Sequence, residues 1–124
     1  MDDCIFCKIV KGEIPCYKIY EDDKIFVFLD RSPQGKGHTL VIPKKHSSNI
    51  HDIDEESLCD VMKGVKMMAK HIKEKLNPDG MNIKQNNGEI AGQAVFHYHV
   101  HIIPKYSEKQ EYDIDELHNI LKIN

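Results

Sequence analysis

The clearest pattern of apolar and polar positions lies in the middle of the chain and predicts one long helix. From residue 58 onward, apolar residues recur every three or four positions, as they do on one face of a helix with 3.6 residues per turn. Asp54 is a typical N-cap, and Ile53 with Leu58 occupies the two positions of a hydrophobic staple. The sequence NPDG at residues 77–80 ends the pattern. The apolar positions of this face are Leu58, Val61, Met62, Val65, Met68, Ala69, Ile72 and Leu76.

Shorter apolar segments on both sides of this helix are separated by Gly-, Pro- and Asp-containing turns and predict strands. The predicted strands are residues 17–21, 24–30, 38–43, 81–85 and 95–104. Short helices are expected at residues 6–11 and 113–123, the second with Ile114, Leu117 and either Ile120 or Leu121 facing inward. Because most strands follow one another directly and only one long helix intervenes, the order favours an α+β fold over a parallel α/β fold.

Length and composition restrict the class of protein. The chain has 124 residues, 40% hydrophobic and 30% charged, so we expect one globular domain over residues 1–124. A formal net charge of -3 does not suit non-specific nucleic-acid binding, which needs a basic surface. The N-terminus lacks a secretory pattern, and no apolar run approaches the roughly 18 residues of a membrane span. We therefore expect a cytoplasmic protein with no membrane or nucleic-acid partner, whose four cysteines form no structural disulfides.

The predicted strand at residues 95–104 contains three histidines at a spacing of two. Alternate residues of a strand share a face, so His97, His99 and His101 would form a row on one face. The residues of the opposite, core-facing side would be Phe96, Tyr98, Val100 and Ile102.

This row has three interpretations: a solvent-facing polar strip, a metal site or a catalytic site. Lysine or threonine would make a polar strip equally well. Same-face neighbours lie roughly 6.6 Å apart along a strand, so His97 and His101 would be about 13 Å apart. They could not both reach one zinc ion, whose bonds to nitrogen are about 2.0–2.1 Å long.

The catalytic interpretation uses the chemistry of imidazole near neutral pH. A ring whose Nδ1–H is held by a carbonyl has its Nε2 lone pair free to attack, while a second histidine binds phosphoryl oxygens or protonates the leaving group. The Gly-containing loop at residues 86–93 would supply backbone N–H groups to a phosphate. Together these features favour nucleotidyl transfer.

The sequence HYHVHII at residues 97–103 resembles the motif of the histidine-triad (HIT) family, and residues 86–93 resemble its phosphate loop. Three upstream blocks resemble its Hint branch: IFCKIVKGEIP at residues 5–15, DRSPQ at 30–34 and HTLVIPKKH at 38–46. The likeness is colinear and covers nearly the whole chain, with the last twenty residues matching least.

This resemblance implies a two-layer α+β fold with an antiparallel sheet and one long helix, and a homodimer whose sheet continues across the interface. It implies hydrolysis or transfer of the nucleotidyl group of purine nucleoside phosphoramidates or related conjugates, with no organic cofactor. His99 would be the nucleophile, forming a nucleotidyl-histidine intermediate. His101 would bind the phosphate and leaving group, His38 would support it, and His97 would complete the triad.

The resemblance also assigns substrate contacts. Asp30 would accept hydrogen bonds from the ribose hydroxyls. The residues at the base-pocket positions are Phe6, Ile9 and Phe28, and those at the phosphate positions are Asn86, Gly92 and Gln93. Two positions depart from the family pattern. Ala94 replaces a hydroxyl residue but keeps its backbone N–H, which predicts altered rate or specificity. Arg31 replaces an aliphatic residue beside the base or ribose, which leaves the base preference open.

The Cys-x-x-Cys sequence near the N-terminus resembles that of zinc-binding members of the family. By this resemblance, Cys4, Cys7, His46 and His97 would form a structural Cys₂His₂ zinc site. The alternative is that the cysteines are small buried hydrophobic residues and His46 is a surface residue.

Three rival functions remain open at this point. One is hydrolysis of dinucleoside polyphosphates, and another is a non-catalytic nucleotide-binding module. The third is metal storage or sensing, in which function would depend on Cys4 and Cys7 rather than on His99.

Overall fold

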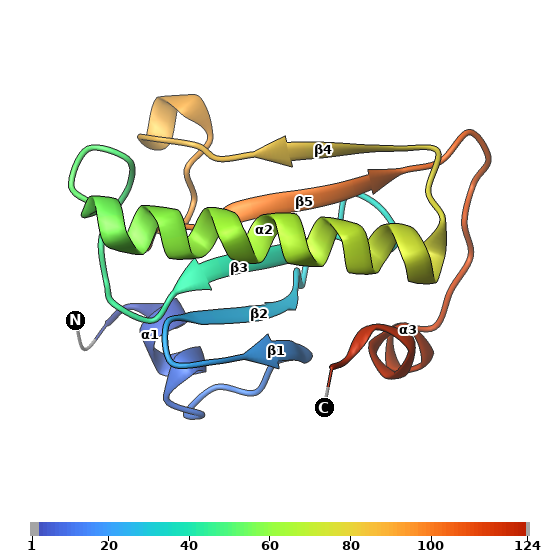
Figure 1. The fold of residues 1–124 in the computed structure, drawn as a ribbon, viewed down its shortest axis with the longest axis horizontal. Coiled ribbons are helices and arrows are strands. Elements are labelled where there is room, and N and C mark those ends of the chain that lie inside the picture. Colours follow the sequence, from blue (N-terminus) through green and yellow to red (C-terminus); the bar gives the residue numbers. More distant parts are fainter. Residues whose placement is uncertain (1–2, 124) are drawn as a thin grey trace.

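The computed structural model describes residues 3–123 and has a five-stranded antiparallel sheet at its centre (Figure 1). The strand order is β1-β2-β3-β5-β4, so β1 and β4 are the two edges. The strands are β1 (Lys18–Glu21), β2 (Ile25–Leu29), β3 (Thr39–Pro43), β4 (Gly80–Lys84) and β5 (Val100–Lys105). The helices are α1 (Ile5–Val10), α2 (Glu55–Leu76), α3 (Ile114–Leu121) and the single-turn 3₁₀ helix η1 (Glu89–Ala91). The predicted α+β class, antiparallel sheet and long helix are confirmed.

The long helix α2 lies across one face of the sheet (Figure 1). The Asp54 side chain caps it by accepting from the Ser57 N–H, and Asn77 ends it in the left-handed conformation. Its buried residues are Val61, Gly64, Val65, Met68 and Ile72. Met62 was expected on this face but is 44% exposed. The contact stripe runs through Gly64 instead, because a residue without a side chain lets the helix approach β2 closely.

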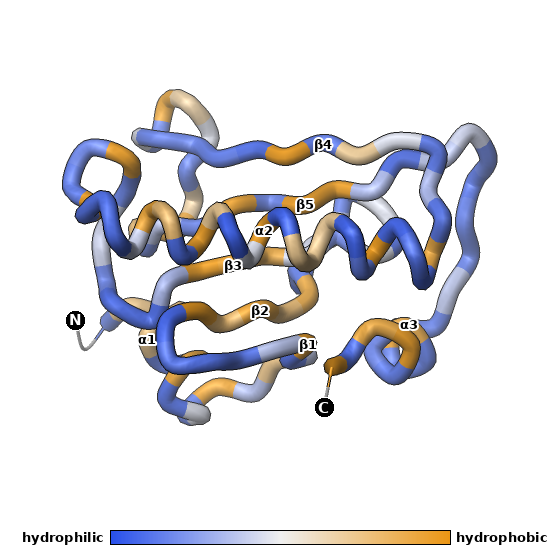
Figure 2. The backbone as a smooth tube through the Cα atoms, viewed as in Figure 1, coloured by the Kyte–Doolittle hydropathy of each residue, from blue (hydrophilic) through white to orange (hydrophobic). Residues whose placement is uncertain are grey.

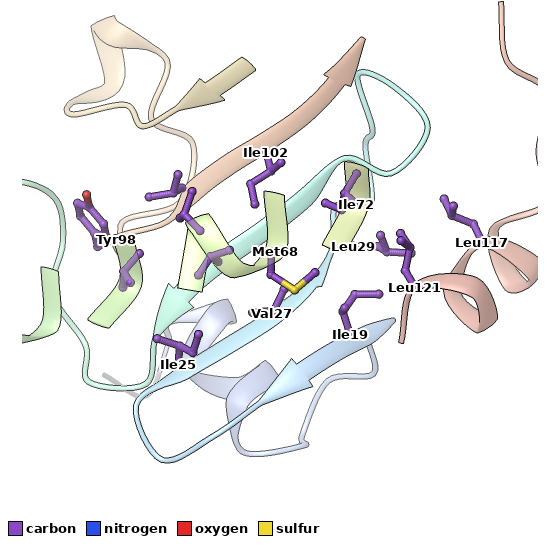
Figure 3. Close-up of a cluster of buried hydrophobic side chains, with 14 residues drawn as sticks. Ile19, Ile25, Val27, Leu29, Met68, Ile72, Tyr98, Ile102, Leu117 and Leu121 are labelled. Carbon is purple, nitrogen blue, oxygen red and sulfur yellow. The ribbon is translucent and has the colours of Figure 1, made fainter. Parts of the chain in front are cut away.

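Side chains alternate between the two faces of the sheet, and both faces are covered around β2. Ile25, Val27 and Leu29 point toward α2 and join the large apolar cluster drawn in Figure 3. Phe26 and Phe28 point to the opposite face, where they pack with residues of α1. Burial on both faces explains why β2 and β3 are largely hydrophobic, whereas α2 carries many hydrophilic residues (Figure 2).

The strand that carries the histidines is shorter than predicted. β5 begins at Val100, and residues 95–99 are irregular. The sheet ladder with β3 stops at the pair Val41 and Val100. Beyond this pair, the backbone N–H of Tyr98 donates to the Ser47 carbonyl and not to a residue of β3. Phe96, expected in the core, is 46% exposed because the irregular segment does not keep the alternation of a strand.

The C-terminal helix α3 packs against α2 and the β1 edge. Leu117 and Leu121 are its buried residues, and Ile120 is 47% exposed, so Leu121 is the inward-facing member of the predicted pair. After α3, the Ile123 N–H donates to the Ile19 carbonyl at 2.8 Å. Among residues 3–123, no helix has the length and apolar character to cross a bilayer.

Candidate active site and metal centre

His99 is held in an orientation that leaves one ring nitrogen for chemistry. Its Nδ1 lies 2.7 Å from the carbonyl oxygen of His97, which can only accept, so Nδ1 carries the proton and donates it. A neutral ring protonated at Nδ1 has its lone pair on Nε2. The ring packs edge-to-face with Phe6, with 5.1 Å between centroids. Burial is the main reason that the pKa of His99 is lowered, which favours the neutral ring.

His97 is fully buried and its two ring nitrogens have different partners. Nε2 lies 2.8 Å from the carbonyl oxygen of Pro43 and must donate to it. The lone pair of the neutral ring is therefore on Nδ1. This atom lies 3.4 Å from Sγ of Cys4 and 3.5 Å from Sγ of Cys7.

These residues belong to a cluster that fits a tetrahedral zinc ion. The ligand atoms of Cys4, Cys7, His46 and His97 all lie within 4.8 Å of one another. Tetrahedral zinc with bonds of about 2.3 Å to sulfur and about 2.0 Å to nitrogen requires sulfur–nitrogen separations of about 3.6 Å. Three such separations here are 3.4, 3.4 and 3.5 Å. The structure thus brings together the four residues that the family resemblance named.

Metal binding at this cluster would displace thiol protons. Burial, together with the neighbouring Cys4 thiol, raises the pKa of Cys7 to about 11. The thiol is therefore protonated at neutral pH unless a cation stabilises the thiolate.

A second group of polar side chains surrounds His38, which is 2% exposed. The Gln34 backbone N–H donates to His38 Nδ1 at 3.0 Å, which places the His38 proton on Nε2. This Nε2–H faces His101 Nδ1 at 2.9 Å and Asp30 Oδ2 at 3.3 Å. Because His101 accepts at Nδ1, its own proton lies on Nε2. His101 therefore presents a donor beside His99, whose ring centroid is 4.9 Å from that of His101.

The direction of these hydrogen bonds argues against a metal ion at Asp30, His38 and His101, although their ligand atoms also lie within 4.8 Å of one another. The His38 lone pair is already used at Nδ1, so its Nε2 could bind a cation only by losing the ring proton. Burial is the main cause of the lowered pKa of His38. Burial is also the main cause that lowers the pKa of His101 to about 4. The group is a network of neutral rings beside one carboxylate.

The loop before the histidines is fixed by Gln93, which is 2% exposed. Its side-chain oxygen accepts from the Gly88 N–H at 2.8 Å, and its amide donates to the carbonyls of Ser48 and Val95. Its backbone N–H donates to the Gly88 carbonyl. The polar groups of Gln93 that could donate to a phosphate are thus engaged within the protein.

Ala94 and its neighbours differ from Gln93 in this respect. Ala94 is exposed, and its backbone N–H has no hydrogen-bond partner in the part of the chain that the structure describes. Gly92 has a φ of 95°, in the left-handed region, and its carbonyl accepts from the Asn86 amide at 3.4 Å. The N–H of Ala94 is therefore one donor of this loop that could bind an anion.

The positions assigned to base binding lie in two different environments. Phe6, Ile9 and Phe28 are 7%, 4% and 2% exposed and pack in one apolar cluster. Arg31 is exposed and lines, together with Asp30, a cavity of about 760 Å³ next to the β1 edge. The assignment of Phe6, Ile9 and Phe28 to the base remains a prediction.

Residues 11–108 match the HIT domain. The chain belongs to the HIT family. It is 50% identical over 106 residues to the adenosine 5′-monophosphoramidase of Schizosaccharomyces pombe, which covers 86% of this chain and 77% of the relative. It is 47% identical over 123 residues to a HIT-like protein of Methanocaldococcus jannaschii, with coverage of 92% and 95%.

The fold of this HIT protein matches solved structures equally well. The crystal structure of a zinc-bound histidine triad family protein from Mycobacterium smegmatis has a TM-score of 0.90 and 35% identity, covering 98% of this chain and 91% of that one. The family to which this chain belongs thus includes a zinc-bound member, and this chain has a cluster of two cysteines and two histidines.

The sequence did not reveal which backbone groups orient the histidines of this HIT protein. The Pro43 carbonyl sets the proton of His97, and the Gln34 N–H sets that of His38. Every residue type offers a carbonyl and nearly every one an N–H, so no pattern of side chains marks these two positions.

Proposed function

We propose that this HIT protein hydrolyses purine nucleoside 5′-phosphoramidates or related nucleotide conjugates and releases the nucleoside monophosphate. The observation that carries the proposal is the hydrogen bond from His99 Nδ1 to the His97 carbonyl, which leaves the Nε2 lone pair as a nucleophile in a neutral ring. The name of the Schizosaccharomyces pombe relative as an adenosine 5′-monophosphoramidase supports the substrate class.

The reaction would occur in two displacements at phosphorus. In the first, the His99 Nε2 lone pair forms a bond to phosphorus and the P–N bond breaks, with the nitrogen leaving with the bonding pair and taking a proton from solvent. In the second, water forms a P–O bond, the bond from phosphorus to Nε2 breaks, and water loses a proton to solvent. The proton stays on Nδ1 and is donated to the His97 carbonyl throughout. This hydrogen bond stabilises the positive ring of the intermediate.

Neighbouring groups would stabilise the charge on the phosphoryl oxygens. The His101 Nε2–H is a donor oriented by His38, and the Ala94 N–H is a second donor. Asp30, whose side chain is 18% exposed, would accept hydrogen bonds from the ribose hydroxyls.

We also propose that Cys4, Cys7, His46 and His97 hold a structural zinc ion. When bound, zinc would cross-link the start of α1 to the segment that carries the nucleophile. The chain's own contribution is the His97 ring, whose side chain would hold the ion while its carbonyl orients His99. The zinc content of the purified protein, measured by elemental analysis, is expected to be one ion per chain.

A homodimer with a continuous sheet is the third part of the proposal. β4 is an edge strand, and it carries Ile83, which is 46% exposed. Ile90 of η1, which follows β4 along the chain, is fully exposed. Light scattering on the purified protein is expected to give twice the chain mass, and Ile83→Lys is expected to reduce it to one chain mass.

The test of the activity is the His99→Ala variant with an adenosine 5′-phosphoramidate as substrate. Loss of the nucleophile is expected to reduce kcat by about 10³-fold or more. His51→Ala, which removes an exposed histidine, is the matched control and should keep wild-type turnover. Full activity of His99→Ala would refute the assigned role, and a preference for dinucleoside polyphosphates would change the assigned substrate.

A further inference from the structure

We propose that Asn49 and Asn87 position the backbone N–H of Ala94 for the phosphoryl group, by holding the β4–β5 loop against the β3–α2 loop. The β3–α2 loop comprises residues 44–54 and the β4–β5 loop residues 85–99, and both lie at the same end of the sheet (Figure 1). The inference deepens the proposed function and rests on its use of the Ala94 N–H as a donor. The two asparagines act through Gln93 and through the loop backbone, so they are positioning residues.

The side chain of Gln93 makes four hydrogen bonds, and two of them cross to the β3–α2 loop. Its Nε2 donates to the Ser48 carbonyl at 2.6 Å, and its Oε1 accepts from Asn49 Nδ2 at 3.3 Å. The other two stay in its own loop, with the Gly88 N–H at 2.8 Å and the Val95 carbonyl at 3.1 Å. Both amide hydrogens and the oxygen are thus used, which fixes the orientation of this side chain.

The direction of the Asn49 amide is set by the turn in which it lies. Its Oδ1 accepts from the His51 N–H at 3.1 Å, so its Nδ2 end faces Gln93. The Asp52 carboxylate closes the turn by accepting from the N–H groups of Asn49 and Ser48 at 2.9–3.0 Å. These backbone donors hold the pKa of Asp52 below its usual value, so the carboxylate stays ionised at neutral pH. The β3–α2 loop therefore presents a fixed donor to Gln93.

Asn87 makes a second link between the two loops. Its Oδ1 accepts from the Ile50 N–H at 2.8 Å. The Asn87 amide is itself held by Gln85, which donates to its Oδ1 at 2.7 Å and accepts from its Nδ2 at 2.9 Å. The link therefore joins the backbone of the β3–α2 loop to a side chain whose orientation is already set.

Side chains, and not a backbone ladder, connect the two loops. In the part of the chain that the structure describes, no backbone–backbone hydrogen bond joins residues 44–54 to residues 85–95. The Ala94 N–H follows directly after Gln93, whose own N–H donates to the Gly88 carbonyl at 3.0 Å. The direction of the Ala94 N–H therefore depends on how firmly Gln93 and its loop are held. Loss of the links from the asparagines should let this donor move away from the phosphoryl group.

Binding measurements with AMP and with adenosine, which lacks the phosphate, test the inference without requiring turnover. Calorimetry would give the Kd of both ligands for the wild type, for Asn49→Ala, for Asn87→Ala and for the double variant. Each single variant is expected to raise the Kd of AMP by about fivefold, the effect of one lost hydrogen bond. The double variant is expected to raise it by about 25-fold, because the two links act separately. The Kd of adenosine should stay within about twofold throughout.

Two further variants separate the link from the turn and from general damage. Asn49→Ser keeps an oxygen that accepts from the His51 N–H but is too short to reach Gln93. It should weaken AMP as Asn49→Ala does, and it carries the test if Asn49→Ala fails to fold. Asn119→Ala removes an exposed asparagine of α3 and should bind both ligands as the wild type does.

The outcomes distinguish this inference from the proposed function. The wild type should bind AMP more tightly than adenosine by about tenfold or more, because hydrogen bonds to a charged phosphate are strong. If that preference is present and both Asn49→Ser and Asn87→Ala retain it, or if adenosine weakens as much as AMP, the positioning role is overturned and the proposed function stands. Equal Kd values of AMP and adenosine in the wild type would contradict the anion donor of the proposed function and this inference together.

Discussion

The two faces of the sheet are formed by the same strands but carry different side chains. The face under α2 is apolar, with Val27, Met68 and Ile102 fully buried (Figure 3). The face under α1 combines an aromatic cluster with buried histidines. In β5 this division follows the alternation of a strand, because Ile102 joins the apolar cluster while His101 faces His38. One face therefore supplies most of the apolar burial, and the other can hold polar groups that chemistry needs.

The largest expected effect comes from a change on the α2 face. Met68→Ala should lower the free energy of unfolding by about 2–5 kcal/mol, because it leaves a cavity at a fully buried position. The folded fraction should keep its kcat. Urea denaturation and turnover of adenosine 5′-phosphoramidate below the unfolding transition measure the two quantities.

Met62→Ala is the matched control, because it removes the same side chain from the same helix at a 44% exposed position. Its free energy of unfolding should change by less than about 0.5 kcal/mol. A clear loss of kcat in the folded fraction of Met68→Ala would contradict the division between the two faces.

A change on the α1 face should act mainly on activity. Cys4→Ser combined with Cys7→Ser is expected to remove zinc and to reduce kcat by about 10–100-fold, because α1 and His97 would no longer be tied together beside His99. Elemental analysis and turnover are measured on the same preparation.

Cys59→Ser changes an exposed thiol on α2 and should alter neither zinc content nor kcat. Zinc loss without any loss of kcat in the double variant would limit the metal to a role apart from the nucleophile.

The contact between α2 and β2 provides a test of intermediate size. Gly64→Ala should lower the free energy of unfolding by about 1–3 kcal/mol even though alanine favours helices, because the added Cβ would collide with Cδ1 of Ile25. Ile25→Val removes that methyl group, so the double variant should recover part of the loss. A Gly64→Ala protein more stable than the wild type in urea would contradict the close packing.

The smallest expected effect is a change in pH dependence on the α1 face. The pKa of His101 is lowered to about 4, mainly by burial, with His99, His38 and Lys84 adding to the lowering and Asp30 opposing it. An unfolded histidine titrates near about 6.5, so the unfolded chain takes up this proton first as the pH falls. The stabilisation from the neutral ring is complete above about pH 6.5 and is lost progressively toward pH 4.

His101→Gln should therefore lose less stability than the wild type when urea denaturation is repeated from pH 7.5 down to pH 4.5. His51→Gln, at an exposed position, should follow the wild-type curve. Parallel curves for His101→Gln and the wild type would show that the pKa of His101 is not lowered in the folded protein.

The sequence predicts the α2 face better than the α1 face. The helix boundaries follow from local chemistry, since Asp54 caps the helix and Asn77 ends it. The apolar period places Val65 and Met68 inward, but it does not separate Met62 from its neighbours, because the position of the stripe depends on which strand the helix touches.

The sequence identified the segment with the three histidines as important but did not predict its conformation. The structure places His97 and His101 in two different groups of neighbouring side chains, whereas the expected continuous strand from residue 95 is wrong. Whether residues 95–99 join a ladder depends on partners distant in sequence, and the carbonyls of Pro43 and Ser47 decide it. These carbonyls carry no sequence signature.

The most direct test of the central claim is the mass of the enzyme during turnover. The wild-type protein mixed with adenosine 5′-phosphoramidate and quenched in the steady state should carry one AMP group, and peptide mapping should place it on His99. The His99→Ala variant should carry none. An adduct on His97 or His101, or catalysis with no adduct in a rapid quench series, would contradict the role of the His99 Nε2 lone pair.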